Sequence, residues 1–101
     1  MSKTERRKGL EGQQEVHRLF RTLGIDLDKL AGQGDRVWYV ANGDAIRLEI
    51  KNQKRKQIDM WVDQSEAETP ATMTPAVVWR RRDGRWRLDI DLEDAIGLVS
   101  G

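Results

Sequence analysis

The segment Ala45–Lys51 alternates strictly between two kinds of residue, and it constrains the fold more than any other part of the chain. A period of two is typical of a β-strand, in which successive side chains point to opposite faces of the sheet. One face of this strand is apolar and the other is charged: Ile46, Leu48 and Ile50 against Arg47, Glu49 and Lys51. The sequence therefore predicts a strand with a hydrophobic core on one side and ionic groups on the other.

The remaining periodic segments place this strand in a mixed architecture. The expected elements are a helix from about Lys8 that Gly24 terminates, strands at 36–40 and 45–51, a helix at 57–68, strands at 76–79 and 85–90, and a short closing helix at 92–99. Residues 25–34 carry glycines and little periodicity, which indicates a loop. The order helix, two strands, helix, two strands predicts an α/β (α+β) fold, with a mixed central sheet of about four strands flanked by helices. At 101 residues, positions 1–101 form one small domain.

The hairpin between the first two strands offers a test of register. A two-residue Asn42-Gly43 turn would pair Arg36 with Glu49, whereas a three-residue loop with Gly43 left-handed puts Asp35 opposite Glu49. A shared metal site needs the second arrangement or a kink near Asp35. We expect a positive φ at Gly43 and the two carboxylates facing one another.

Composition limits the chemistry that the chain can carry. The chain has no cysteine and a single histidine, His17, so thiolate zinc and His-rich metal sites are excluded and any metal must be held by carboxylates. No window is apolar enough to cross a membrane, and the lack of cysteine fits a cytoplasmic protein. The net charge is only +1, but basic residues gather in three blocks around positions 3–8, 51–56 and 80–87. Segregated charge of this kind suits a surface that faces phosphates, although each block alone could be ordinary solvated surface.

Asp35, Glu49 and Lys51 are the candidate chemical groups. Two carboxylates on neighbouring strands can hold a hard cation such as Mg²⁺, and a lysine beside them can steady an attacking water or a phosphate oxygen. This set of groups suits phosphodiester hydrolysis. The alternative is that Glu49 and Lys51 form a surface ion pair without a catalytic role.

Several short motifs occur in an order that resembles the PD-(D/E)XK nuclease superfamily, and in particular small phage-type endonucleases that resemble Holliday junction resolvases. The motifs span roughly residues 7–92: Lys8-Gly9, Gly12-Gln13-Gln14-Glu15-Val16, Gly34-Asp35, Glu49-Ile50-Lys51-Asn52-Gln53, Trp61-x-x-Gln64, and Pro75-Ala76-Val77-Val78-Trp79-Arg80 followed by Trp86. The resemblance implies a restriction-endonuclease-like core.

The resemblance also implies roles for individual residues. Asp35 and Glu49 would bind Mg²⁺ or Mn²⁺, with the carbonyl of Ile50 as a further oxygen ligand, and Lys51 would be the catalytic lysine. Glu15 would complete or support the metal site from the first helix. Gln64 would orient the lysine or a phosphate. Products with a 5′-phosphate and a 3′-hydroxyl, and a homodimer, are expected on the same ground.

The first helix departs from the family pattern at one position. Many relatives carry an acid four residues after the glycine that matches Gly9, and here that residue is Gln13. At about 100° per residue, Gln13 and Glu15 lie on opposite flanks of the apolar helix face, and Glu11 lies further toward solvent. Glu15 is therefore the preferred helix carboxylate, with Glu11 as the next choice.

The expected function is a metal-dependent endonuclease acting on branched DNA. The basic residues Lys8, Lys54, Arg55 and Lys56 would grip the DNA backbone, whereas the role of Arg80–Arg82, toward DNA or toward a partner subunit, stays open. Two alternatives are a DNA-binding module without catalysis, and a general nuclease that trims nicks, flaps or linear duplex.

Overall fold

The computed structural model of the chain describes residues 3–29 and 36–100. Within these ranges the helices and strands are α1 (Lys3–Thr22), β1 (Asp28–Lys29), β2 (Arg36–Tyr39), β3 (Ala45–Lys51), α2 (Ile58–Glu68), β4 (Thr74–Arg80), β5 (Trp86–Ile90) and α3 (Leu92–Ser100). The bounds of β3 are those that the alternating pattern predicts.

The strands form one mixed sheet in the order β1-β2-β3-β4-β5. Neighbouring strands run antiparallel except β3 and β4, which are parallel and are joined through α2. The architecture is α+β, as expected. The count of about four strands and the order helix, two strands, helix, two strands are wrong, because β1 adds a fifth strand between α1 and β2. Two residues are too short to show any alternation, so pairing with β2 next to the buried Leu27 defines this strand.

Two hairpins share one loop geometry. Loops of three residues follow Val40 and Arg81, and each loop ends in a glycine with positive φ, +92° at Gly43 and +89° at Gly84. In the first hairpin, Val40 N–H donates to Asp44 O at 3.0 Å, and Arg36 pairs with Leu48. Both the left-handed glycine and the predicted register are thereby confirmed. Asp35 lies outside the described residues.

The end of α1 follows from its glycine as well. Gly24 has φ +83°, and the N–H groups of Gly24 and Ile25 donate to Arg21 O and Phe20 O, both at 2.9 Å. This pair of bonds satisfies carbonyls that the helix end would otherwise leave open. The helix begins at Lys3 rather than near Lys8, because its charged first turns carry no apolar period that could mark them.

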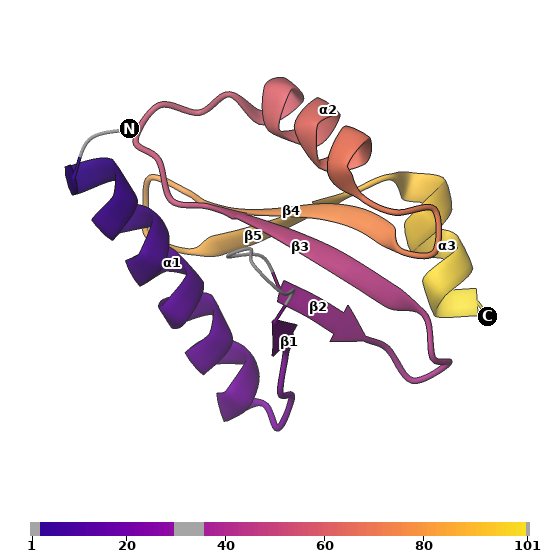
Figure 1. Ribbon diagram of the computed structural model, residues 1–101. Helices are drawn as coiled ribbons and strands as arrows, with labels where there is room; N and C mark the ends of the chain where they lie inside the picture. Colours follow the sequence, from indigo (N-terminus) through magenta and orange to yellow (C-terminus); the bar gives the residue numbers. More distant parts are fainter. Residues whose placement is uncertain (1–2, 30–35, 101) are drawn as a thin grey trace.

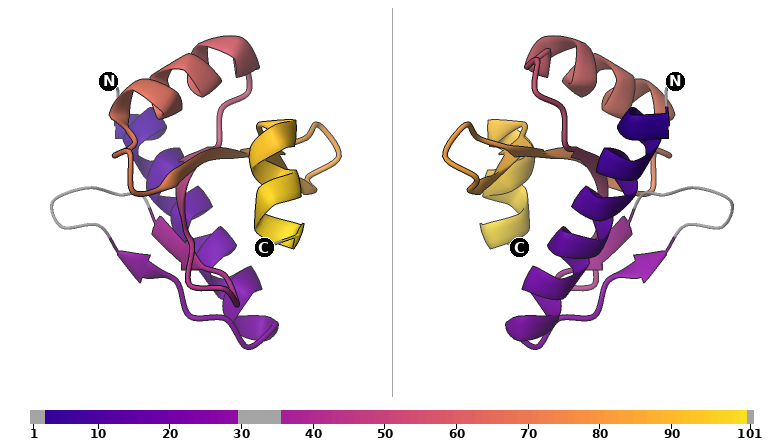
Figure 2. Two further views of the ribbon diagram at one scale, coloured as in Figure 1. Left: turned by 90° about the vertical axis from the view of Figure 1, so that its right-hand side faces the viewer. Right: turned by 90° about the vertical axis from the view of Figure 1, so that its left-hand side faces the viewer.

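Helices cover both faces of the sheet. On one face, Val16 of α1 packs in a cluster with Leu48 and Ile50 of β3. On the other face, α2 buries Trp61 and Ser65. Figures 1 and 2 show α1 and α2 on opposite sides of the strands, with α3 at the far end from the start of α1. Because β3 is enclosed by neighbours on both faces, two of its charged residues, Arg47 and Glu49, are buried too.

Gly12 lets α1 approach the end of β3 closely. A Cβ atom at Gly12 would lie 2.8 Å from Cβ of Asn52 and 3.2 Å from Cη2 of Trp86. We expect Gly12→Ala to lower the free energy of unfolding by about 1–3 kcal/mol, because the helix must shift to admit the methyl group. Urea denaturation followed by circular dichroism measures this.

Gly9 provides the matched control on the same helix. Its added Cβ would meet nothing within 4 Å, so Gly9→Ala should raise the free energy of unfolding by about 0.5–1 kcal/mol through helix propensity alone. Equal effects of the two substitutions would contradict the close approach at Gly12.

Candidate active site

The charged face of β3 carries two nearly inaccessible ionic side chains. Arg47 is 1 % exposed and Glu49 is 6 % exposed. Arg47 Nη1 donates to Glu49 Oε2 at 3.0 Å, and Lys51 Nζ lies 3.4 Å from Glu49 Oε1. Each oxygen of Glu49 therefore faces one cation. Buried charges are tolerated when they are paired in this way.

Helix α2 closes these groups into a ring. Gln64 Oε1 lies 3.5 Å from Lys51 Nζ, and Gln64 Nε2 donates to Glu68 Oε1 at 3.2 Å. Glu68 Oε2 lies 3.4 Å from Arg47 Nη2, which returns to the strand. We call the five side chains the polar ring: Arg47, Glu49, Lys51, Gln64 and Glu68. Three sequence-predicted site residues, Glu49, Lys51 and Gln64, therefore meet in one place.

The polar ring runs from the interior to the surface. The Arg47 side chain is 2 % exposed, the Lys51 side chain 17 % and the Glu68 side chain 48 %. Two cations and two carboxylates balance within the ring. Arg47 thus acts as the buried anchor, and Lys51 presents its ammonium group near solvent.

A hollow of about 760 Å³ opens beside Glu49 and Lys51. The first half of α1 and the segment after β3 form its walls, and we call it the Glu49 hollow. Its lining residues include Glu49 and Lys51 and, around them, Lys8, Gln13, Ile50, Lys54 and Arg55. Four residues predicted as ligands or phosphate contacts, Ile50, Lys8, Lys54 and Arg55, therefore lie around the predicted catalytic pair.

The predicted helix carboxylate, Glu15, has different partners. Arg80 binds it in a two-pronged pair, with Nη2 at 3.1 Å from Oε1 and Nη1 at 3.2 Å from Oε2. Trp86 Nε1 also donates to Oε1 at 3.2 Å. Glu11 pairs with Arg7 at 3.8 Å on the exposed side of the helix. Of the three candidate positions on α1, Gln13 is the one that lines the Glu49 hollow.

A carboxylate metal site needs partners for Glu49. Among residues 3–29 and 36–100, no group of three or more histidine, aspartate and glutamate side chains converges. Asp35, the other predicted ligand, lies outside these ranges. Glu49 and the carbonyl of Ile50 are hard oxygen donors of the type that Mg²⁺ and Mn²⁺ accept, so the donor chemistry fits such an ion. The Arg47 guanidinium holds Glu49 Oε2, and Lys51 lies against Oε1.

Sequence reasoning missed Arg47 and Glu68 as members of the site. The alternation already put Arg47 on the same face as Glu49 and Lys51. The missing signal was that β3 is an interior strand covered on both faces, where an unpaired arginine would be too costly. Glu68 follows Gln64 by four residues, a spacing that brings helical side chains together.

None of the helices within the described ranges is long and apolar enough to cross a membrane.

Comparisons with protein-family models and with curated proteins gave no match for this chain. The assignment to a class of protein therefore depends on the motifs and on the site geometry.

Proposed function

We propose that the protein is a divalent-metal-dependent endodeoxyribonuclease of the PD-(D/E)XK type that cuts branched DNA. The observation that carries this proposal is the pairing of Glu49 with Lys51 at 3.4 Å beside a hollow walled by Lys8, Lys54 and Arg55. A carboxylate for a metal, an ammonium group for a phosphate and a basic approach surface are what hydrolysis of a DNA backbone requires.

The ionic contacts assign a separate role in the proposed hydrolysis to each residue of the site. Arg47 and Lys51 fix the orientation of the Glu49 carboxylate, since each oxygen has a cationic neighbour. Gln64 lies against Lys51 from α2 and limits the directions in which the ammonium group can point. An ammonium group held in this way stabilises negative charge that develops on the phosphoryl oxygens.

Asp35, Glu49 and the carbonyl of Ile50 are the proposed metal ligands. A bound Mg²⁺ or Mn²⁺ would polarise the phosphate and lower the pKa of a bound water. The confirmed pairing of Arg36 with Leu48 supports this set, because it is the register on which the opposition of Asp35 and Glu49 depends.

Branched DNA is the preferred substrate because the sequence carries no motif typical of an element that reads base sequence. Contacts to the backbone recognise shape and position rather than sequence. A four-way junction has two-fold symmetry, so a homodimer would present two sites to opposed strands. Such an enzyme would act in the cytoplasm on DNA intermediates.

A DNA-binding module without catalysis is the second candidate. Gln13 favours it, because this amide lines the Glu49 hollow at the position where many relatives carry an acid. Fewer carboxylates would weaken metal binding, while the basic walls would still attract DNA.

Cleavage assays separate these functions. A labelled four-way junction, a flap and a plain duplex are incubated with the protein in Mg²⁺ or in EDTA. We expect cleavage of the junction in Mg²⁺ alone. Binding without cleavage of any substrate would favour the module, and equal cleavage of all three substrates would favour a general nuclease.

A further inference from the structure

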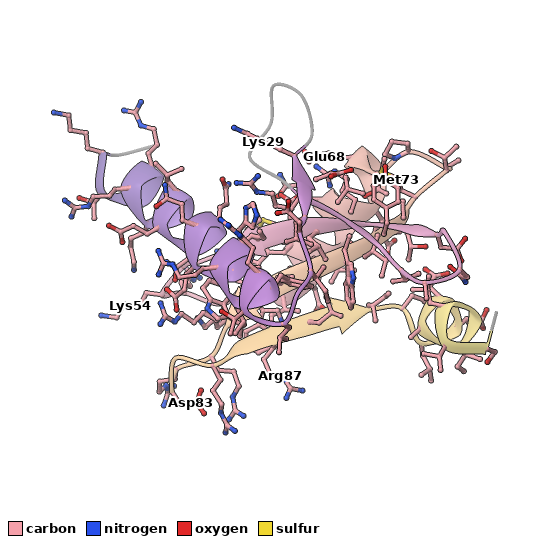
Figure 3. The ribbon with its side chains drawn as sticks, turned by 90° about the horizontal axis from the view of Figure 1, so that it is seen from below. Lys29, Lys54, Glu68, Met73, Asp83 and Arg87 are labelled. Atoms are coloured by element: carbon pink, nitrogen blue, oxygen red, sulfur yellow. The ribbon has the colours of Figure 1, made fainter. Side chains whose placement is uncertain are left out.

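The β4–β5 hairpin brings a third basic segment to the end of the molecule where Lys8 and Lys54 lie. Figure 1 shows the turn between β4 and β5 at the same end as the first turns of α1 and the connection from β3 to α2. In Figure 3, Lys54 and Asp83, which belong to this connection and this turn, also lie at one end of the molecule. Basic blocks that are distant in the sequence therefore meet in space.

These segments enclose a second hollow of about 620 Å³. We call it the basic hollow, after its six cationic residues: Lys8, Lys54, Lys56, Arg80, Arg81 and Arg82. The other lining residues are Asn52, Gln53 and Trp79, and none of the described residues that line the hollow is acidic. Because the whole chain has a net charge of only +1, the rest of the molecule is net acidic. Cationic side chains are therefore concentrated at this hollow, with the charge of Arg80 offset by Glu15.

The basic hollow continues from the Glu49 hollow. Lys8, Asn52, Gln53 and Lys54 line both of them. A DNA strand with one phosphate near Lys51 would therefore reach the basic hollow with a neighbouring part of its backbone. Shared walls of this kind suit a continuous ligand better than two separate small molecules.

The hairpin is held rigidly enough to present its side chains. Arg80 is fixed by Glu15, by a hydrogen bond from its Nε to Gly84 O at 3.0 Å, and by the Trp86 ring, whose centroid lies 5.3 Å from its guanidinium carbon. Arg81 and Arg82 follow directly and are exposed. Glu15 thus anchors the hairpin to α1 while the next two arginines face outward.

Burial and neighbouring cations act on Lys56 in the same direction. Burial, followed by the charges of Lys8, Arg80 and Arg82, lowers the pKa of the Lys56 ammonium group below its usual value. A phosphate among these groups would offset the repulsion and favour the charged form of the lysine. The direction of this shift agrees with the crowding of cationic side chains around the hollow.

We propose that the basic hollow is a second phosphate-binding site, which holds the DNA backbone next to the cleaved position through Arg81, Arg82 and Lys56. This inference rests on the proposed function, and it assigns the β4–β5 hairpin to DNA rather than to a partner subunit. The site would position the substrate and would not take part in bond cleavage.

Salt-dependent binding tests this site. Affinity for a fluorescein-labelled four-way junction is measured by anisotropy in EDTA between about 50 and 200 mM NaCl, where each phosphate contact adds about 0.9 to the slope of log affinity against log salt. We expect Arg81→Gln/Arg82→Gln to reduce that slope by about 1–2 and Lys56→Gln to reduce it by about 1. The three side chains are exposed, so circular dichroism should show an unchanged fold.

A second arginine pair controls for net charge. Arg18→Gln/Arg21→Gln removes the same charge from exposed positions of α1 that begin about 15 Å along the helix from Lys8. The slope should stay at the wild-type value in this variant. An unchanged slope in the hairpin variant, or an equal loss in both variants, would overturn the second site.

The two proposals can fail separately. If Mg²⁺ supports junction cleavage but the hairpin substitutions leave the slope unchanged, the second site is wrong and the nuclease proposal stands. If no substrate is cut but the slope falls as expected, the nuclease proposal is wrong and the basic hollow stands as a DNA-binding site.

Discussion

Replacing Lys51 with alanine is expected to lower the rate of Mg²⁺-dependent junction cleavage by about 10²–10³-fold. Removing one preorganised group that stabilises transition-state charge typically has an effect of this size. Binding of the junction in EDTA should change little, because a group needed only in the transition state contributes little to ground-state affinity. Single-turnover cleavage, with anisotropy under the same conditions, measures both quantities.

The fold should survive this substitution. Lys51 is partly exposed, and its loss leaves Glu49 bound to Arg47 at 3.0 Å, so the carboxylate does not become an unpaired buried charge. We expect the free energy of unfolding to fall by about 1 kcal/mol or less. Lys29→Ala, which removes an exposed lysine from β1, is the control for net charge and should cut at the wild-type rate. Wild-type cleavage by the Lys51 variant would end its catalytic assignment.

The same assay decides the role of Glu15. As a metal ligand, Glu15 would make Glu15→Gln as inactive as the Lys51 variant. Its contacts with Arg80 and Trp86 favour a smaller loss, with weaker docking of the β4–β5 hairpin on α1. A loss of cleavage that excess Mn²⁺ restores would instead support the ligand role that the resemblance implies.

The sequence determined those features that depend on local rules. Strict alternation predicted the bounds of β3. Gly43, which can adopt the left-handed conformation, predicted the register of the first hairpin. Gly24 predicted the end of α1 in the same way. Each of these depends on a few consecutive residues. For the same reason Glu49 and Lys51, two residues apart on one strand, could be placed side by side without a structure.

Features that depend on contacts between distant segments could not be predicted from the sequence. The two residues of β1 are ordered by their pairing with β2 and have no pattern of their own. Glu15 could be placed on one flank of a helix, but only the packing of α1 against β4 and β5 brings Arg80 to it. The burial of Arg47 likewise depends on β2, β4 and α2 enclosing a strand whose charged face looked like a solvated surface.

Arg47→Met is expected to destabilise the protein more than any other single substitution in the polar ring. Arg47 is 1 % exposed and contacts Glu49, Glu68 and the Thr69 hydroxyl. Methionine fills a similar space but leaves Glu49, itself 6 % exposed, without its closest cation. We expect a loss of about 3–5 kcal/mol in the free energy of unfolding, because Glu49 Oε2 loses its buried cation while Lys51 faces only Oε1.

A loss of this size is a large part of the total free energy of unfolding of a small domain. Domains are stable by about 5–15 kcal/mol, so the Arg47 variant should be close to unfolding at 37 °C. Thermal unfolding followed by circular dichroism would show it, since each kcal/mol lowers Tm by about 4–8 °C in a domain of this size. Glu68→Gln is the matched comparison: the Glu68 side chain is 48 % exposed and can be hydrated, so its loss should be about 1 kcal/mol or less.

The double variant Arg47→Met/Glu49→Leu separates a stranded charge from lost packing. Removing both charges of a buried pair is often neutral or stabilising, so the double variant should regain most of the Tm that Arg47→Met loses. A double variant as unstable as Arg47→Met would show that the arginine acts through packing or through its other partners. Recovery of Tm without recovery of cleavage would separate the two tasks of Glu49: with Arg47 it completes the interior of the sheet, and with Lys51 it serves the proposed chemistry.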